Sequence, residues 1–185
     1  MIRTRLALCL LLAAATPAFA GEGDIDKVNG SITIDPAQHA GDLDTVNGSI
    51  RIGANATAGD ASTVNGSIQI GDGAHTGALE TVNGAIGLVG TELGGGIDTV
   101  NGDITVGIGS HVKGGIKVEK PNNNWFGIHM GKPRPPRIVI GPNAVVDGPL
   151  VFEREVKLYV HSTAKTGTIT GATAVRFDTP TAPQD

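Results

Sequence analysis

The tripeptide Val-Asn-Gly occurs five times in the chain, beginning at Val28, Val46, Val64, Val82 and Val100, and every interval is 18 residues. A fixed period of this kind is typical of repeat architectures, in which each unit buries its apolar face only against its neighbours. The sequence therefore predicts a fold built by stacking similar coils. Such a scaffold carries no chemistry of its own, so function has to come from sites placed on it.

Each unit contains the pattern of a strand with one buried face. Residues 42–53 run Asp-Leu-Asp-Thr-Val-Asn-Gly-Ser-Ile-Arg-Ile-Gly, and the end of this unit alternates apolar and polar residues with period two. Apolar residues form columns at the second, fifth, ninth and eleventh positions, which are Leu43, Val46, Ile50 and Ile52 in this unit. We predict an all-β fold, a right-handed single-stranded β-solenoid (β-helix) with an 18-residue coil repeat and about eight coils.

The Asn-Gly pair before each strand predicts a corner, because both residues tolerate positive φ. Stacking at about 4.8 Å would place the asparagines in one ladder, in which each amide can bond the next. The ladder consists of Asn29, Asn47, Asn65, Asn83 and Asn101. The first three also have the Asn-x-Ser form of glycosylation acceptors, which the period alone explains. Asn-Gly between alternating apolar residues also favours a hairpin, so a meander with a second turn in each unit is an alternative.

Residues 1–20 have the pattern of a secretory signal peptide, in which Arg3 and Arg5 precede a short apolar run and small residues occupy the cleavage positions. The run is shorter than the roughly 20 residues of a transmembrane helix, so we expect no integral membrane segment. The single cysteine, Cys9, lies inside this segment, which leaves the remaining chain without a disulfide. We expect export through the Sec route to the periplasm or the outside of the cell.

Charge is distributed unevenly along the chain. Residues 21–112 contain 12 acidic and 2 basic residues, whereas residues 113–185 contain 6 acidic and 10 basic ones. Opposite charge at the two ends of a rod favours end-to-end contact, so self-association is one expected kind of interaction. The acidic total and the expected export argue against nucleic acid as a partner.

The period weakens beyond residue 113. Residues 121–136 interrupt one coil, and the strand pattern resumes at Arg137, which predicts a loop extruded from one corner of a solenoid domain that spans residues 21–178. Two looser coils follow, and Phe177 is placed to cap the last one. Residues 179–185, Thr-Pro-Thr-Ala-Pro-Gln-Asp, are predicted to be a disordered tail.

Two segments resemble known families. The Thr-Val-Asn-Gly-Ser-Ile-x-Ile-Gly units at residues 45–53 and 63–71 resemble those of the putative-adhesin domain family of bacterial β-solenoids. Residues 138–150, Ile-Val-Ile-Gly-Pro-Asn-Ala-Val-Val-Asp-Gly-Pro-Leu, resemble the bactofilins, a family of polymer-forming cytoskeletal right-handed β-helices. The first likeness implies an adhesin-like surface module, and the second implies a self-assembling scaffold.

Carboxylates form two columns, one on each side of the apolar residue at the second position of the unit. The first column contains Asp24, Asp42 and Asp60, and the second contains Asp26, Asp44, Glu80 and Asp98. Stacked like charges repel, and a divalent cation bound by several oxygens would relieve that repulsion. Calcium at Asp42, Asp44 and Asp60 is one interpretation, and a solvated acidic face is the other.

Three histidines share the sixteenth position of alternate units, with Thr57 and Leu93 between them. They are His39, His75 and His111. Alternate coils lie about 9.6 Å apart, which is too far for one zinc ion bound at about 2.1 Å. No catalytic signature such as Gly-x-Ser-x-Gly or His-Glu-x-x-His occurs in the sequence, and we expect neither an enzyme nor a bound cofactor.

The interrupting loop contains the one adjacent aromatic pair of the sequence, Trp125 and Phe126, with Lys132, Arg134 and Arg137 close by. An aromatic anchor surrounded by basic residues on a protruding loop is typical of a binding patch. Alternatively, the two rings fold back to cover an open side of the solenoid.

We predict an exported structural or adhesin-like module. The alternatives are a self-assembling scaffold and a periplasmic binding protein that uses this loop to bind a partner protein or glycan at the cell surface or in the periplasm.

Overall fold

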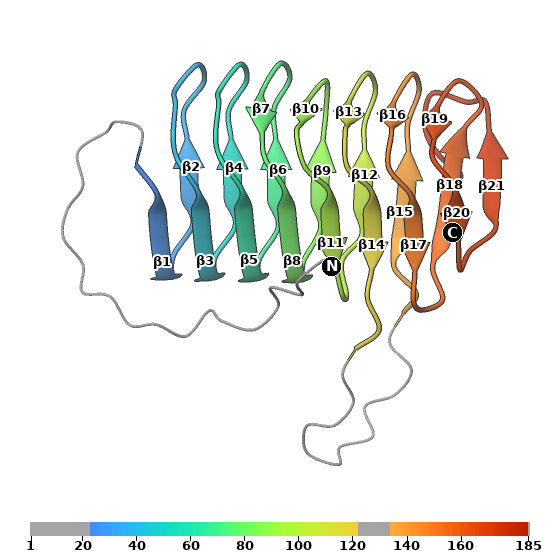
Figure 1. Cartoon of the computed structure of the whole chain (residues 1–185), viewed down its shortest axis with the longest axis horizontal. Helices are drawn as coiled ribbons and strands as arrows, with labels where there is room; N and C mark the ends of the chain where they lie inside the picture. The colour runs from blue at the N-terminus through green and yellow to red at the C-terminus, as the bar shows by residue number, and fades with distance from the viewer. Residues whose placement is uncertain (1–22, 122–133, 185) are drawn as a thin grey trace, which may run out of the picture.

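The computed structural model describes residues 23–121 and 134–184, and every regular element in these residues is a β-strand. The strands stack into an elongated β-solenoid, in which two of the three sheets contain eight strands (Figure 1). All strand pairs are parallel. The predicted β-solenoid is confirmed, and the meander is wrong because it would pair neighbouring strands antiparallel.

The three sheets, here called faces A, B and C, each take one strand from successive coils. Face A contains β1 (Ile25–Asn29), β3 (Leu43–Asn47), β5 (Ala61–Asn65), β8 (Leu79–Asn83), β11 (Ile97–Thr99), β14 (Ile116–Val118), β17 (Leu150–Phe152) and β20 (Ile169–Thr170). Face B contains β2 (Ile32–Ile34), β4 (Ile50–Ile52), β6 (Ile68–Ile70), β9 (Ile86–Leu88), β12 (Ile104–Val106), β15 (Arg137–Ile140), β18 (Lys157–His161) and β21 (Ala174–Phe177). Face C contains β7 (His75–Thr76), β10 (Glu92–Leu93), β13 (His111–Val112), β16 (Val145–Val146) and β19 (Lys165–Thr166).

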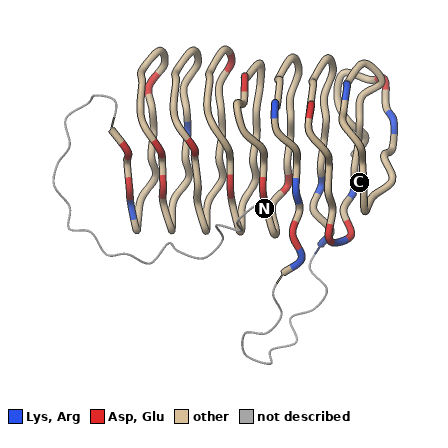
Figure 2. The backbone as a smooth tube through the Cα atoms, in the orientation of Figure 1, with Lys and Arg blue, Asp and Glu red and all other residues tan. Residues whose placement is uncertain are grey.

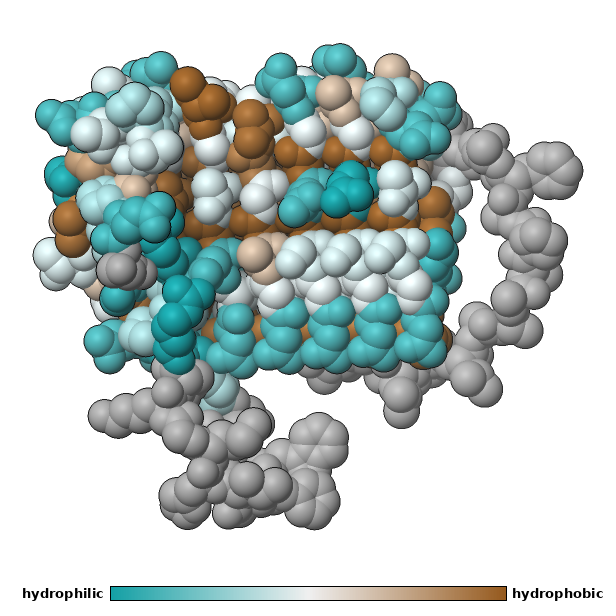
Figure 3. Space-filling model, turned by 180° about the vertical axis from the view of Figure 1, so that it is seen from behind, coloured by the Kyte–Doolittle hydropathy of each residue, from teal (hydrophilic) through white to brown (hydrophobic). Residues whose placement is uncertain are grey.

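Inward side chains of the same kind stack on one another and form the core. Ile50, Ile68, Ile86 and Ile104 are in register along face B, and each is at most 1% exposed. Residues at the second and eleventh positions of successive units are paired in the same way. The predicted apolar columns at the second, ninth and eleventh positions are therefore confirmed. On the outer surface, too, residues of like hydropathy form bands that run along the length of the molecule (Figure 3).

The valine column differs from the other apolar columns because its first four members are not buried, and only Val100, at 8% exposure, is. Val28 is 61% exposed, and Val46 is half-buried. The cause is the two-residue alternation of a strand: Leu43 faces inward, so Thr45 does too, and Val46 faces out. Threonine therefore continues the core on face A.

The buried threonine hydroxyls bond the preceding coil. Each donates to the carbonyl of a corner glycine: Thr45 Oγ1 to Gly30 O at 3.1 Å, Thr63 Oγ1 to Gly48 O at 2.9 Å, and Thr81 Oγ1 to Gly66 O at 3.2 Å. Thr99 is buried in the same column, but its hydroxyl has no partner among the described residues. The column is therefore satisfied along its length except at this last member.

At the Asn-Gly corner, the backbones of successive coils lie in direct contact. A Cβ on Gly66 would lie 1.8 Å from Gly48 O, and a Cβ on Gly48 would lie 2.1 Å from Gly30 O. Positive φ, the reason we expected for glycine here, is found at Gly30 (115°) and Gly84 (158°) and not at every corner. Close approach between coils is the more general requirement for glycine.

One coil breaks the period on face C. Glu92, and not Leu93, pairs with His75 and His111, so the register predicted for the histidine column is wrong in this coil. The turn before β10 is one residue shorter than the turn before β7, and consecutive glycines at 94–96 restore the register before β11. A deletion and an insertion within one unit leave the Val-Asn-Gly spacing unchanged, which is why the spacing did not reveal the shift.

The C-terminal end of the solenoid is capped by an aromatic ring. Phe177 is 7% exposed and packs edge-on against His161, with ring centroids 5.0 Å apart. Residues 179–184, predicted to belong to a disordered tail, lie within the described part of the chain, where the Arg137 guanidinium donates to Pro183 O at 2.7 Å. Disorder of this tail stays a prediction. Within residues 23–121 and 134–184, no helix is long and apolar enough to cross a membrane.

Substitution of a corner glycine should be far more costly than substitution of a strand glycine. We expect Gly66→Ala to lower the free energy of unfolding by about 2–4 kcal/mol, because the added Cβ would collide with backbone atoms. Gly87→Ala is the matched control, since nothing lies within 4 Å of a Cβ there, and it should stabilise by about 0.4–1 kcal/mol. Denaturant melts of the two variants test this, and equal effects would contradict the packing described for the corner.

The buried threonine column gives a second comparison. Thr63→Val removes a hydrogen bond to Gly48 O and should cost about 0.5–1.5 kcal/mol, whereas Thr99→Val removes a buried hydroxyl without a described partner and should be neutral or stabilising. Thermal unfolding of both variants measures the difference. A larger loss for Thr99→Val than for Thr63→Val would show that the Thr99 hydroxyl is satisfied in solution.

Candidate binding surfaces

The predicted aromatic patch is only partly described. Trp125, Phe126 and Lys132 lie outside the described residues, so their role stays a prediction. Arg134 lies on the returning leg of the loop and Arg137 is the first residue of β15. Both contact one carboxylate: the Arg134 guanidinium forms an ion pair with Asp103, and the Arg137 backbone N–H donates to Asp103 Oδ1 at 2.8 Å. The two arginines therefore attach the loop to the preceding coil.

Two acidic residues that the sequence reasoning did not single out lie at the base of the loop. Asp103 receives the returning leg, and Glu153 Oε2 accepts a hydrogen bond from the Lys120 backbone N–H on the outgoing leg at 3.4 Å. Asp103 occupies the repeat position that is serine at Ser49 and Ser67. This change of residue at a repeat position is the sequence feature that could have identified Asp103 as a site residue.

The asparagine ladder is present as predicted. Each side-chain amide donates to the one before it, at 3.1 Å for Asn47 to Asn29, 3.0 Å for Asn65 to Asn47, 3.1 Å for Asn83 to Asn65 and 3.2 Å for Asn101 to Asn83. The ladder is exposed to solvent. Arg154, from the coil after the loop, donates to Val100 O at 2.9 Å and also to Asn101 Oδ1, and so terminates the ladder.

The first acidic column is a chain of hydrogen bonds between coils. Oδ1 of each aspartate accepts the backbone N–H of the next coil: Asp42 N to Asp24 at 2.9 Å, Asp60 N to Asp42 at 2.9 Å and Ala78 N to Asp60 at 2.7 Å. Asp42 and Asp60, two of the residues predicted for calcium, therefore have a structural use. In the described part of the chain, no three His, Cys, Asp or Glu side chains are grouped as metal ligands would be. The calcium site stays a prediction.

The second acidic column forms an outward row on face A. Asp26, Asp44, Ser62, Glu80 and Asp98 are paired in sequence along the sheet. Desolvation by the neighbouring coils, followed by repulsion from Asp98, raises the pKa of Glu80, and desolvation followed by repulsion from Asp26 raises the pKa of Asp44. Acidic residues predominate in the N-terminal coils and most basic ones lie in the C-terminal coils (Figure 2).

Face C carries a group of ion pairs built around the shifted coil. Glu92 pairs with Lys113 at 2.8 Å and lies 3.8 Å from His75, while His111 Nε2 lies 2.7 Å from Asp147 Oδ2. Hydrogen bonding and attraction by Lys113 lower the pKa of Glu92. These pairs are solvent-exposed, so their effect on stability is small and depends on salt.

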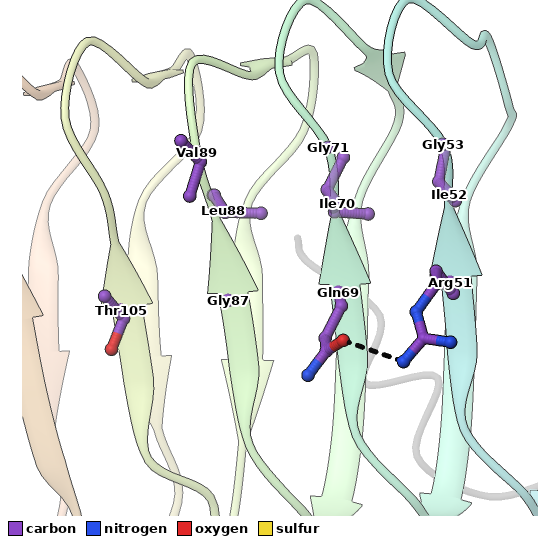
Figure 4. A pocket seen from close by; sticks show the side chains of 10 residues that line it. All are labelled: Arg51, Ile52, Gly53, Gln69, Ile70, Gly71, Gly87, Leu88, Val89 and Thr105. Atoms are coloured by element: carbon purple, nitrogen blue, oxygen red, sulfur yellow. Dashed lines mark hydrogen bonds between the residues drawn. The ribbon is translucent and has the colours of Figure 1, made fainter. Parts of the chain in front are cut away.

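Face B has a shallow hollow where the outward row lacks a side chain. Gly87 lies between Gln69 and Thr105 in this row, and the hollow above it has a volume of about 450 Å³ (Figure 4). Val89 borders it on one side, and Arg51 donates to Gln69 Oε1 at 3.2 Å. The sequence showed Gly87 only as a departure from the polar residue found at this position in neighbouring units.

Comparison of the chain with protein-family models, with curated proteins and with solved structures found no match. The likenesses to the adhesin-type solenoids and to the bactofilins therefore stay predictions.

Carboxylates on faces A and C should respond oppositely to pH. The raised pKa of Glu80 means that the folded state binds its proton more tightly, so stability declines as pH rises from about 4.3 through the folded value. Glu80→Gln should therefore stabilise the fold at pH 7 by about 0.2–1 kcal/mol. It should have no effect at pH 3, where the glutamate and the glutamine are both neutral.

The lowered pKa of Glu92 adds stability at any pH above the pKa of the unfolded chain, and this stability is lost as the pH falls through the pKa of the folded chain. Glu92→Gln should therefore destabilise the fold at pH 7. Thermal melts at both pH values test this, and the same sign for both variants at pH 7 would refute it.

Proposed function

We propose that this chain is an exported, non-enzymatic structural or adhesin-like module that acts in the periplasm or at the cell surface. The observation that supports a structural role is the use of the repeated polar groups. The asparagine amides, the aspartate carboxylates and the threonine hydroxyls all bond one coil to the next. A rod connected in this way keeps its outer faces at fixed spacing, which suits a scaffold.

Export is supported by the residues at the start of the sequence. The two arginines, the apolar run and the small residues of segment 1–20 have the order found in secretory signals, although this segment lies outside the described residues. The adhesin-like role rests on the likeness of the repeated units to the adhesin-type solenoids. Self-assembly, the role suggested by the bactofilin likeness, is consistent with the separation of charge along the rod.

A second candidate function is recognition of a partner protein or glycan by the loop at residues 121–136. The observation in its favour is that both legs are attached to neighbouring coils, through Glu153 on one side and Asp103 on the other. Attachment at both legs fixes the position from which the loop leaves the solenoid. A recognition loop needs this kind of support from a rigid scaffold.

Two measurements test the proposed function. Fractionation of cells that express the tagged chain should find it outside the cytoplasm, and deletion of residues 2–20 should keep it inside. Beads coated with residues 21–185 should then be retained on cell envelopes or on the surface of neighbouring cells. Retention of a variant lacking residues 122–133 at the same level would favour the solenoid faces, and loss of retention would favour the loop.

Each outcome bears on one part of the proposal. A cytoplasmic chain with residues 1–20 uncleaved would overturn export. An exported chain that shows no retention, and that light scattering finds monomeric at both 0.05 and about 0.5 M salt, would overturn the adhesin-like and self-assembling roles together.

A further inference from the structure

The segment that follows the Phe177 cap turns back over face B. Arg137, on β15, donates from its guanidinium to Pro183 O at 2.7 Å, and the same guanidinium lies 4.9 Å from the centre of the Tyr159 ring. Inside the segment, Thr179 Oγ1 donates to Thr181 O at 2.8 Å. Residues 179–184 thus lie across strands that precede them by several coils.

This segment borders a hollow on face B, here called the tail trough. The sheet side of the trough is lined by Thr105, Ile108, Arg137, Val139, Pro142 and Phe177, and its volume is about 710 Å³. Pro180, Thr181, Ala182 and Gln184 of the segment line the other side. Ile108 stays 57% exposed, so the segment leaves apolar surface of the trough uncovered.

The segment has the sequence of a proline-containing recognition peptide, and its backbone bends at residues 179–181. Pro180 and Pro183 are spaced as Pro-x-x-Pro, and proline fixes φ and carries no backbone N–H. Such peptides lose little conformational entropy on binding and offer backbone carbonyls to donors beside an apolar groove. Here the donor is Arg137, and the apolar surface is provided by Ile108, Val139 and Pro142.

We propose that the part of face B beside the tail trough, on which residues 180–184 lie, is a docking site for a proline-containing peptide of a partner protein, and that residues 180–184 cover this site in cis. The partner has the Pro-x-x-Pro spacing, presents a carbonyl to Arg137 and carries no positive charge at that point, because the guanidinium would repel it. The tethered segment competes with this partner at an effective concentration in the millimolar range, as a short flexible connection provides. The inference concerns a site on face B and depends on neither export nor the loop.

Binding of a labelled peptide with the sequence of residues 179–185, Thr-Pro-Thr-Ala-Pro-Gln-Asp, tests the proposal by fluorescence anisotropy. Two full-length chains are compared: the native sequence and the variant Pro180→Gly/Pro183→Gly, in which the chain's own segment should bind face B more weakly. A third chain ends at Asp178 and retains the Phe177 cap. The shortened chain should bind the peptide at least about 10-fold more tightly than the native chain, with the glycine variant between them. Absence of binding to the shortened chain, or equal binding to all three, would overturn the proposal.

Two substitutions locate the site. In the Pro180→Gly/Pro183→Gly chain, Ile108→Asp should remove most of the peptide affinity, because Ile108 lines the trough. Val28→Asp is the matched control: Val28 is 61% exposed and lies on β1 of face A, away from the trough, so affinity should be unchanged. Thermal melts confirm that both chains are folded. Equal loss from the two substitutions, or equal binding of a peptide with both prolines replaced by alanine, would refute the assigned site.

Discussion

The contact between backbones at the Asn-Gly corner is the constraint on which the solenoid depends. The carbonyl of Gly48 lies where a side chain on Gly66 would have to go, and the same carbonyl accepts the hydroxyl of Thr63. Glycine at the corner and threonine on face A are thus both required by the position of this carbonyl, although they lie on different parts of the coil. Once coils stack this closely at one corner, the strands on faces A and B meet at pairing distance and the other columns fall into register.

The sequence predicted the features that repeat and missed the features that interrupt a repeat. The all-β solenoid, the isoleucine core and the asparagine ladder follow from an 18-residue period with two-residue alternation inside it. The outward direction of Val46 could have been found by counting from Leu43, because a strand places every second residue on one side. The shift at Glu92 could not have been found in this way. One residue is lost in the turn before Glu92 and one glycine is gained after it, so the spacing to the next Val-Asn-Gly is unchanged.

The candidate binding surfaces lie where a repeat position changes its residue. A serine position becomes Asp103 and receives the loop, and a polar position becomes Gly87 and opens a hollow. Long-range contacts such as Arg154 with Asn101 and Arg137 with Pro183 have no local pattern, because each joins residues separated by more than 40 positions.

The asparagine ladder also gives the rod an electrical direction. Every side-chain amide in it points the same way, with nitrogen toward the N-terminal coil and oxygen toward the C-terminal one. Aligned amide dipoles add, as they do along an α-helix, so a partial negative charge collects at the Asn101 end. The guanidinium of Arg154 lies at that end, where a cation is favoured. The ladder therefore has a dipole that runs parallel to the stacking axis, and its negative end contacts a cation from beyond the loop.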